Sequence, residues 1–293
     1  HSYATGSPDA GFYIGQCYPC DAIVNNVISE YNGLGYSGTN SGGSLYITSS
    51  IFRNNKGGLA PNTLDSELLP PESETFIIGN LIENNNNYNS PATNSTYLSY
   101  GNGVVIAGGN NNIIKNNVIV DHDLYGVILT ASMDVNYWPA HGNRVEENLI
   151  LSSRKADIAV SGVSNLANCF EGNYFNTSIP PGLQALNGCE KNIIPLSADL
   201  SGLWSTIARL IYANTGDFYQ DDWRTLPAPD QQENMPIMQE IIDANNNEQY
   251  ELGFYQYLPS FKNSVKPAVN VYEDYKYTLK DVQLPQEAIK YLN

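Results

Sequence analysis

The sequence predicts an all-β protein in which residues 1–190 form a right-handed parallel β-helix. A short phrase recurs six times, and each copy places a small polar residue before an apolar pair. Those polar residues are Asn26, Ser50, Asn80, Asn117, Asn148 and Asn173. Their spacings are 24, 30, 37, 31 and 25 residues, and the phrases carry short β-branched runs without helical periodicity. Such a repeat is typical of one turn of a parallel β-solenoid whose longer turns loop out the excess.

The repeated asparagine is expected at a corner between strands. Asn tolerates the left-handed backbone region better than other non-glycine residues, because its short amide can bond locally. Stacked turns bring equivalent amides to a spacing of about 4.8 Å, so their side chains can hydrogen-bond along the stack as a ladder.

Each turn is expected to contain two apolar strands. The first holds an apolar pair, and only one member of each pair should face the interior. The pairs are Val27-Ile28, Ile51-Phe52, Leu81-Ile82, Val118-Ile119 and Leu149-Ile150. The second strand begins near Leu34, Leu59, Val104, Val127 and Ile158, commonly after a glycine. The alternative is an antiparallel sandwich, which is disfavoured because hairpin dipeptides do not separate the strands.

The pattern changes beyond residue 190. Apolar residues from Leu196 to Ile211 fall three and four apart, which predicts an amphipathic helix within residues 191–216. Laid over the last turn, this helix would cap the open strand edges. Residues 217–293 are predicted to form an irregular C-terminal arm, with a helix near 235–244 and one or two strands near 269–279. We expect the arm either to pack along its own β-helix or to reach a neighbouring molecule and support assembly.

Composition narrows the classes of partner. The 293 residues have 30 acidic and 14 basic side chains, a net charge of −16, and only 15% charged residues. This balance opposes binding to nucleic acid, to anionic membranes and to polyuronates, since all three need clustered Lys and Arg. No apolar run reaches the 18 or so residues of a membrane span. The sequence opens at His1 within the repeat pattern, which indicates a processed form or a missing upstream part.

The cysteines predict an oxidising compartment. We expect structural disulfides, with Cys17 and Cys20 as a local clip and Cys169 and Cys189 as a link between neighbouring turns, although the sequence does not fix the connectivity. The alternatives for the Cys17-x-x-Cys20 pair are a zinc site, which would want a second close pair, and a redox motif. Asn94 and Asn176 stand in Asn-x-Ser/Thr acceptor triplets for glycosylation, compatible with an extracytoplasmic location.

Candidate catalytic residues cluster around the fourth phrase. His122 and Asp123 follow Asn117, with Lys115 upstream and Arg144 about one turn onward, so a base, an acid and a carboxylate-neutralising cation could converge. His122-Asp123 partly resembles the Asp-Pro-His-Asp phrase of mannuronan epimerases, β-helix enzymes that abstract a sugar proton beside a carboxylate. Val120 and Asp121 stand where that phrase has Asp and Pro. The alternative for His122 is a hydrogen-bonded corner residue.

Candidate metal ligands lie after the second phrase. Asp65 and Glu67 are predicted to bind Ca²⁺ together with a backbone carbonyl, mainly as a structural site. The segment Asn62-Thr63-Leu64-Asp65 is similar to the Asn-Thr-Asp element of polygalacturonases, but that family's other elements are missing from the sequence. Two further options are a copper site at His1 and a joint site of His122 with His141.

Tyrosine is over-represented, with 21 Tyr against 8 Phe. The Tyr88–Tyr100 loop and the Tyr137-Trp138 segment should lie along one side of adjacent long turns. There they either bind sugar rings or protein partners, or seal the loops against the β-helix wall.

Residues 1–190 also resemble, as a whole, the bacterial right-handed parallel β-helix repeat proteins. The stretches 13–20, 35–40, 62–67 and 169–173 carry the resemblance. It implies a protein that is secreted or attached to the cell surface, and it assigns no reaction. We therefore expect an extracytoplasmic binding or assembly module, in the periplasm, on the cell surface or secreted, with carbohydrate or protein as its partner. The alternative is a carbohydrate-active lyase or epimerase acting on a polysaccharide in a groove of the β-helix.

Overall fold

A computed structural model of the chain describes residues 2–93, 99–161, 167–189 and 282–292. The chain divides into two compact units, residues 1–228 with 283–293 and residues 229–282. All of the elements described below belong to the first unit. Among the described helices, none has the length and hydropathy needed to cross a bilayer.

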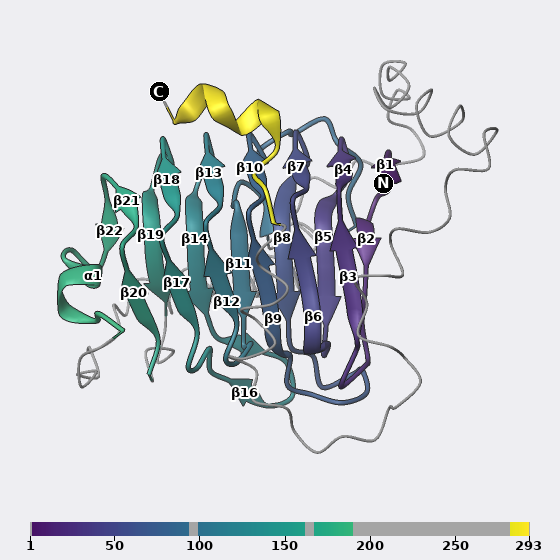
Figure 1. The fold of residues 1–293 in the computed structure, drawn as a ribbon. Coiled ribbons are helices and arrows are strands. Elements are labelled where there is room, and N and C mark those ends of the chain that lie inside the picture. Colours follow the sequence, from purple (N-terminus) through teal and green to yellow (C-terminus); the bar gives the residue numbers. More distant parts are fainter. Residues whose placement is uncertain (1, 94–98, 162–166, 190–281, 293) are drawn as a thin grey trace. The chain divides into compact units, whose positions relative to one another are not determined.

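The first unit is mostly β, with three long parallel sheets that the chain visits in turn (Figure 1). The first sheet contains β1 (Ser2–Thr5), β4 (Val27–Glu30), β7 (Ile51–Arg53), β10 (Leu81–Glu83), β13 (Val118–Val120), β18 (Leu149–Leu151) and β21 (Tyr174–Phe175). The second contains β2 (Ala10–Tyr13), β5 (Leu34–Thr39), β8 (Gly57–Asn62), β11 (Val104–Ala107), β14 (Tyr125–Thr130), β19 (Ala156–Ser161) and β22 (Ser178–Ile179). The third contains β3 (Ala22–Asn25), β6 (Gly42–Thr48), β9 (Ser73–Ile78), β12 (Ile113–Lys115), β17 (Arg144–Glu146) and β20 (Cys169–Glu171).

Parallel pairing joins every neighbouring pair of strands within these three sheets. The antiparallel pair in the described chain is the short hairpin of β15 (Ser132–Met133) and β16 (Tyr137–Trp138). The all-β prediction is therefore confirmed, and the alternative of an antiparallel sandwich is wrong. The two predicted strands of each turn are confirmed, but a third strand per turn, on the third sheet, was not predicted.

Side chains from all three sheets pack into one core. Its members include Phe52 and Ile82 of the first sheet, Leu59 of the second and Ile77 of the third. The neighbours Ile51 and Leu81 belong to a separate cluster on the outer face of the first sheet. One member of each of these apolar pairs thus faces the core and the other faces away from it, as the alternation of side chains along a strand requires.

The corner before the first sheet uses two adjacent residues for two tasks. The first has a positive φ, as at Asn116 (54°), and turns the chain. The next has a buried amide that forms the ladder. Asn117 Oδ1 accepts the backbone N–H of Asn80 (2.9 Å), and Asn148 Oδ1 accepts that of Asn117 (2.9 Å). The predicted ladder is present, but the asparagine in it is not the left-handed residue.

This division corrects the position predicted for Asn26, the first of the six repeated polar residues. Ile28 pairs with Ile51, so Val27, not Asn26, lies opposite Ser50, and the Val27 N–H donates to Ser50 Oγ (3.1 Å). Asn26 has a φ of 53° and is the turn residue of its corner. The sequence predicted Asn26 at the ladder position, one residue before the true one, because Asn suits both the turn position and the ladder position.

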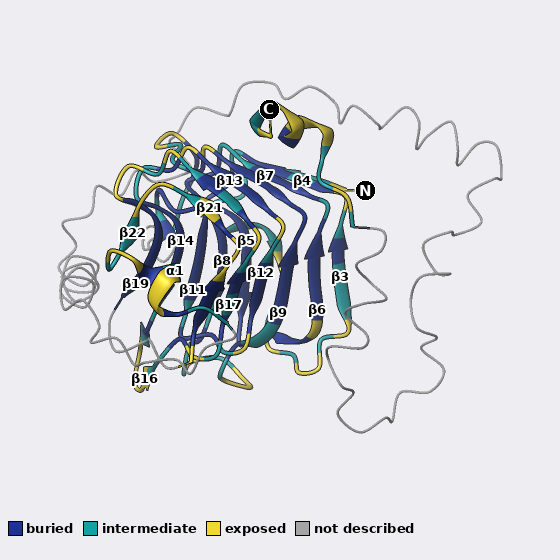
Figure 2. Cartoon of the chain, turned by 60° about the vertical axis from the view of Figure 1, so that its left-hand side comes forward, coloured by how far each residue is buried: buried dark blue, intermediate teal, exposed yellow. Residues whose placement is uncertain are grey.

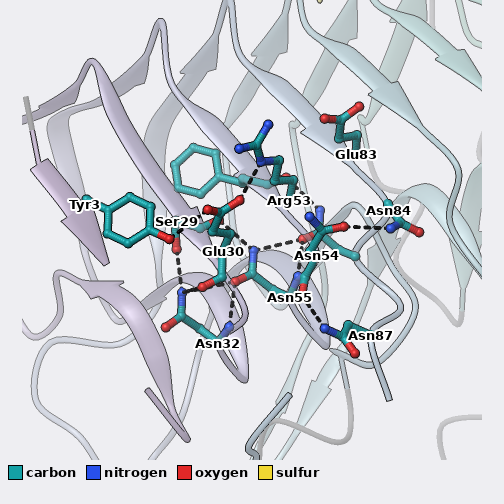
Figure 3. A network of polar contacts seen from close by, with 12 residues as sticks. Tyr3, Ser29, Glu30, Asn32, Arg53, Asn54, Asn55, Glu83, Asn84 and Asn87 are labelled. Atoms are coloured by element: carbon teal, nitrogen blue, oxygen red, sulfur yellow. Dashed lines mark hydrogen bonds and ion pairs between the residues drawn. The ribbon is translucent and has the colours of Figure 1, made fainter. Parts of the chain in front are cut away.

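Two further ladders fill the other corners. Between the first and second sheets, Asn55 Oδ1 accepts the N–H of Asn32, beside the Glu30–Arg53 ion pair (Figure 3). Asn85 Oδ1 accepts the N–H of Asn55 in the same way. Before the third sheet, the ladder runs through Thr75, Asn112, Asn143 and Asn168. Buried side chains at these corners, most of them amides, satisfy the backbone where the strands end.

The C-terminal end of the stack is closed by α1 (Leu183–Leu186). Leu183 is fully buried in the core, and Gln184 Oε1 accepts the N–H of Asn173 (3.0 Å), so this helix supplies the next ladder amide. The Cys169–Cys189 disulfide joins this segment to β20, and Cys17–Cys20 forms the second bond, so both expected pairings are confirmed. The predicted capping helix at 191–216 lies outside the described residues.

The described end of the C-terminal arm is the 3₁₀ helix η4 (Gln286–Tyr291). Ala288 packs on the outer cluster of the first sheet, and Glu83 accepts bonds from Lys290 Nζ (2.9 Å) and the Tyr291 hydroxyl (2.6 Å). This part of the arm therefore packs along its own sheet and is helical rather than extended. The rest of the predicted arm, residues 217–281, lies outside the described residues.

Candidate functional site

The predicted catalytic histidine is part of the second ladder. His122 occupies the position after Asn85, and its Nδ1 accepts the Asn85 N–H (3.3 Å). The side chain is 2% exposed, and burial lowers the pKa of His122 to about 3. Nε2 has no hydrogen-bond partner among the described residues. The imidazole is thus neutral at physiological pH and closed to a substrate in this conformation.

The other three predicted catalytic residues are held in ion pairs. Lys115 on β12 and Arg144 on β17 both contact Glu146, and Lys115 also contacts Glu147 (3.3 Å). The structure thus brings the two cations together on the third sheet, whereas His122 lies between β13 and β14. Asp123, next to His122, accepts a bond from the Tyr100 hydroxyl (3.1 Å) and faces Arg154.

The predicted metal ligand Asp65 holds two loops together. Its carboxylate accepts the backbone N–H (2.7 Å) and side-chain amide (2.7 Å) of Asn136 and the indole N–H of Trp138 (3.1 Å). These hydrogen bonds, led by the backbone N–H of Asn136, lower the pKa of Asp65. The Asp65 N–H in turn donates to Asp134 (2.9 Å). Asp65 thereby fixes the β15–β16 hairpin to the 63–72 loop between β8 and β9.

Glu67, the other predicted metal ligand, bonds a different neighbour. Its carboxylate accepts the Tyr13 hydroxyl (2.8 Å), and Glu74 accepts the Tyr18 hydroxyl (3.0 Å) in the same way. The Leu68 N–H donates to Gln16 (3.1 Å). These bonds tie the 63–72 loop and the start of β9 to the first turn of the chain, so segments far apart in sequence meet at one surface.

That surface, at the corner between the second and third sheets, carries an unusual share of exposed apolar side chains. Seven of the twelve exposed large hydrophobic residues in the described chain lie here, and we call them the apolar edge. They are Tyr13, Tyr18, Leu68, Leu69, Met133, Val135 and Tyr137. Val135 is 84% exposed and Leu68 70%. Figure 2 shows the exposed end of the hairpin that leads into β16. Clustered apolar exposure of this kind marks binding sites.

The Tyr88–Tyr100 loop leads from the first sheet to the second, so it lies at another corner than the Tyr137-Trp138 segment and not beside it as predicted; its described ends pack against each other. The two rings meet edge to face at 6.2 Å, and Lys56 Nζ lies 5.0 Å from the centre of the Tyr88 ring. Burial, followed by the bond to Asp123, raises the pKa of Tyr100 to about 12. Tyr88 remains half exposed, so Tyr100 is a packing residue and Tyr88 is available at the surface.

The remaining candidates have separate locations. Asn176 of the glycosylation triplet is exposed, whereas Asn94 and His1 lie outside the described residues. His141 is exposed at the corner leading into β17 and His122 is buried at another corner. Glu146 approaches Cys169 and Cys189 closely enough for a shared metal, but the disulfide occupies both sulfurs.

Comparison with protein-family models, curated proteins and solved structures gave no match.

Sequence reasoning missed the aliphatic part of the apolar edge. Leu68, Leu69 and Val135 stand outside the repeated phrases, in the loops that make the turns after Ser50 and Asn117 longer than the shortest turns of the chain. A large apolar residue in the looped-out part of a turn has no place in the core. That signal, applied to each long turn, would have identified both loops.

Proposed function

We propose that this protein is an extracytoplasmic right-handed parallel β-helix that works as a binding module through its apolar edge. Three parallel sheets visited in turn, one core shared by all three and an amide ladder at each corner support the β-helix. Two disulfides and no free cysteine among the described residues support an oxidising compartment.

The observation that carries the binding function is the concentration of exposed apolar side chains on loops that are held rigidly. Asp65 accepts three hydrogen bonds from the hairpin, and Glu67 and Glu74 hold Tyr13 and Tyr18. A surface that is already ordered loses little conformational freedom on binding, so more of the contact energy appears as affinity.

The enzyme alternative receives no support from His122. A general base must reach the proton that it removes. His122 is 2% exposed, and its imidazole accepts a hydrogen bond in the second ladder. The two cations of the predicted catalytic set, Lys115 and Arg144, are paired with Glu146.

The proposal is tested by comparing wild type with the double variant Leu68→Ser, Val135→Ser on a glycan array and against immobilised peptide and protein libraries. The matched control is Tyr174→Ser, Leu292→Ser, which removes exposed apolar side chains (66% and 54%) from other surfaces. We expect at least one ligand to bind wild type and the control equally and to lose at least tenfold in affinity for the edge variant. Binding that is equal for all three proteins would refute the site.

A further inference from the structure

The apolar edge is bordered by carboxylates, and the segments that form it lack Lys and Arg. Residues 13–21, 40–44, 63–74 and 132–141 build this corner and contain no Lys or Arg. Exposed or half-buried carboxylates there are Asp21, Asp65, Glu67, Glu74 and Asp134. The acids facing the corner therefore have no local counter-charge from the segments that form it. Because buried interface charges are costly unless paired, a partner that covers this surface must bring cations of its own.

The apolar side chains restrict the partner further. Leu68, Leu69 and Val135 are branched aliphatic groups with exposures of 70%, 53% and 84%. Sugar rings stack on flat aromatic faces, whereas aliphatic side chains find complementary surface in other apolar side chains. The three edge tyrosines, Tyr13, Tyr18 and Tyr137, fit either partner, since each offers a flat face and a hydroxyl. The aliphatic residues favour a polypeptide.

Charge also excludes two other occupants. A second copy of this chain carries the same net charge of −16 and the same acidic border, so pairing edge to edge would bring like charges together. An anionic membrane surface is repelled for the same reason. A polypeptide with apolar anchors flanked by Lys or Arg satisfies both the aliphatic surface and its border.

We propose that the apolar edge binds a basic segment of a partner protein, with its apolar residues on Leu68, Leu69 and Val135 and its Lys or Arg residues on Glu67, Glu74 and Asp134. This inference rests on the proposed binding function. The contact is preorganised on this side by the Asp65 bonds to the hairpin. The carboxylates draw a cationic segment toward the surface, and the aliphatic side chains hold it there.

Selection from a random 12-residue peptide library on immobilised full-length protein tests the inference. We expect the selected peptides to combine large apolar residues with Lys or Arg, and to lose binding to Leu68→Ser, Val135→Ser but not to Tyr174→Ser, Leu292→Ser. A second variant, Glu67→Gln, Glu74→Gln, Asp134→Asn, removes three charges but keeps an oxygen for each hydrogen bond that these residues accept. This variant should bind the selected peptides about tenfold more weakly at low salt, and its affinity for them should depend less on salt. Circular dichroism of each variant confirms folding.

Each other outcome overturns the inference. The acidic border would play no part in recognition if the selected peptides were not enriched in Lys or Arg. The same would follow if they bound wild type and the Glu67→Gln, Glu74→Gln, Asp134→Asn variant with equal affinity. Glycans that bind the apolar edge when no peptide does would overturn the basic-segment partner while leaving the binding function intact. Failure of both the peptide library and the glycan array would overturn the proposed function as well.

Discussion

Asn117 and Asn116 are adjacent, yet the structure predicts very different costs for removing their side chains. The Asn117 side chain is 1% exposed and makes four hydrogen bonds. Its Oδ1 accepts the N–H and the side-chain amide of Asn80, and its Nδ2 donates to Ile77 O and Asn148 Oδ1, all at 2.9–3.0 Å. At about 1 kcal/mol for each bond, Asn117→Ala should lower the free energy of unfolding by about 4 kcal/mol. The loss is larger if water does not reach the donors and acceptors that lose their partner.

Asn116 is the matched control. Its side chain is exposed and its φ is 54°, so Asn116→Ala loses only the tolerance of Asn for the left-handed region, about 1 kcal/mol. Urea unfolding followed by far-ultraviolet circular dichroism gives both values, and equal m-values would show that the two variants expose the same surface. Equal destabilisation by the two substitutions would refute the separation of turn residue from ladder residue.

Three further predictions concern two buried titratable groups and one disulfide. His122→Asn gives the second ladder an amide at this position, as at Asn55 and Asn85. Burial lowers the pKa of His122 from 6.5 to about 3, so between these pH values the histidine is protonated in the unfolded state but neutral in the folded state. Wild-type stability should therefore fall on acidification through that window by up to about 1.4 kcal/mol per pH unit from this group, and urea titrations at several pH values should show that the variant lacks this slope. Glu72 has the opposite pH dependence, since burial raises its pKa from 4.5 to about 8. Its contribution to the stability of wild type therefore falls as pH rises from 4.5 to 8, and the stability of Glu72→Gln relative to wild type should be greatest at pH 8. An unchanged pH profile in either variant would contradict the corresponding assignment. Cys189→Ser removes the link across 20 residues and should cost about 3 kcal/mol in the same unfolding assay, and reduction of wild type should give a similar loss.

The sequence predicted the class of fold because the same physical demand recurs in every turn. A corner that needs a left-handed residue and a buried amide selects Asn repeatedly, and the apolar pair after it selects one core residue and one outer residue. Because Asn suits both corner positions, the sequence alone can misplace one by a residue. Asn26 occupies the turn position and Asn117 the ladder position, and only the strand register distinguishes them. The third sheet was missed because its corner asparagines, such as Asn143, precede less regular apolar residues.

The candidate sites were harder to predict, since a polar residue in a loop does not reveal its partner. Asp65 reads as a metal ligand in the sequence, but its bonds go to Asn136 and Trp138, about seventy residues away. His122 reads as a base, but the register places it in a ladder whose other members are amides. Both assignments depend on which loops share a corner, and that depends on how many residues each intervening turn loops out.

Turn length itself locates the apolar edge. The shortest turn, from Val27 to Ser50, uses 23 residues for three strands and three corners, whereas the turns from Ser50 to Asn80 and from Asn117 to Asn148 use 30 and 31. Their extra residues fall after the second-sheet strands β8 and β14, in the loops that Asp65 joins. The interior of each turn is constrained by the core and the ladders, and these extra residues lie outside both. The longest turn, of 37 residues from Asn80 to Asn117, places its extra residues before β11, at a different corner. Two long turns that place their extra residues at the same corner therefore predict one surface, and here that surface carries Leu68 and Val135.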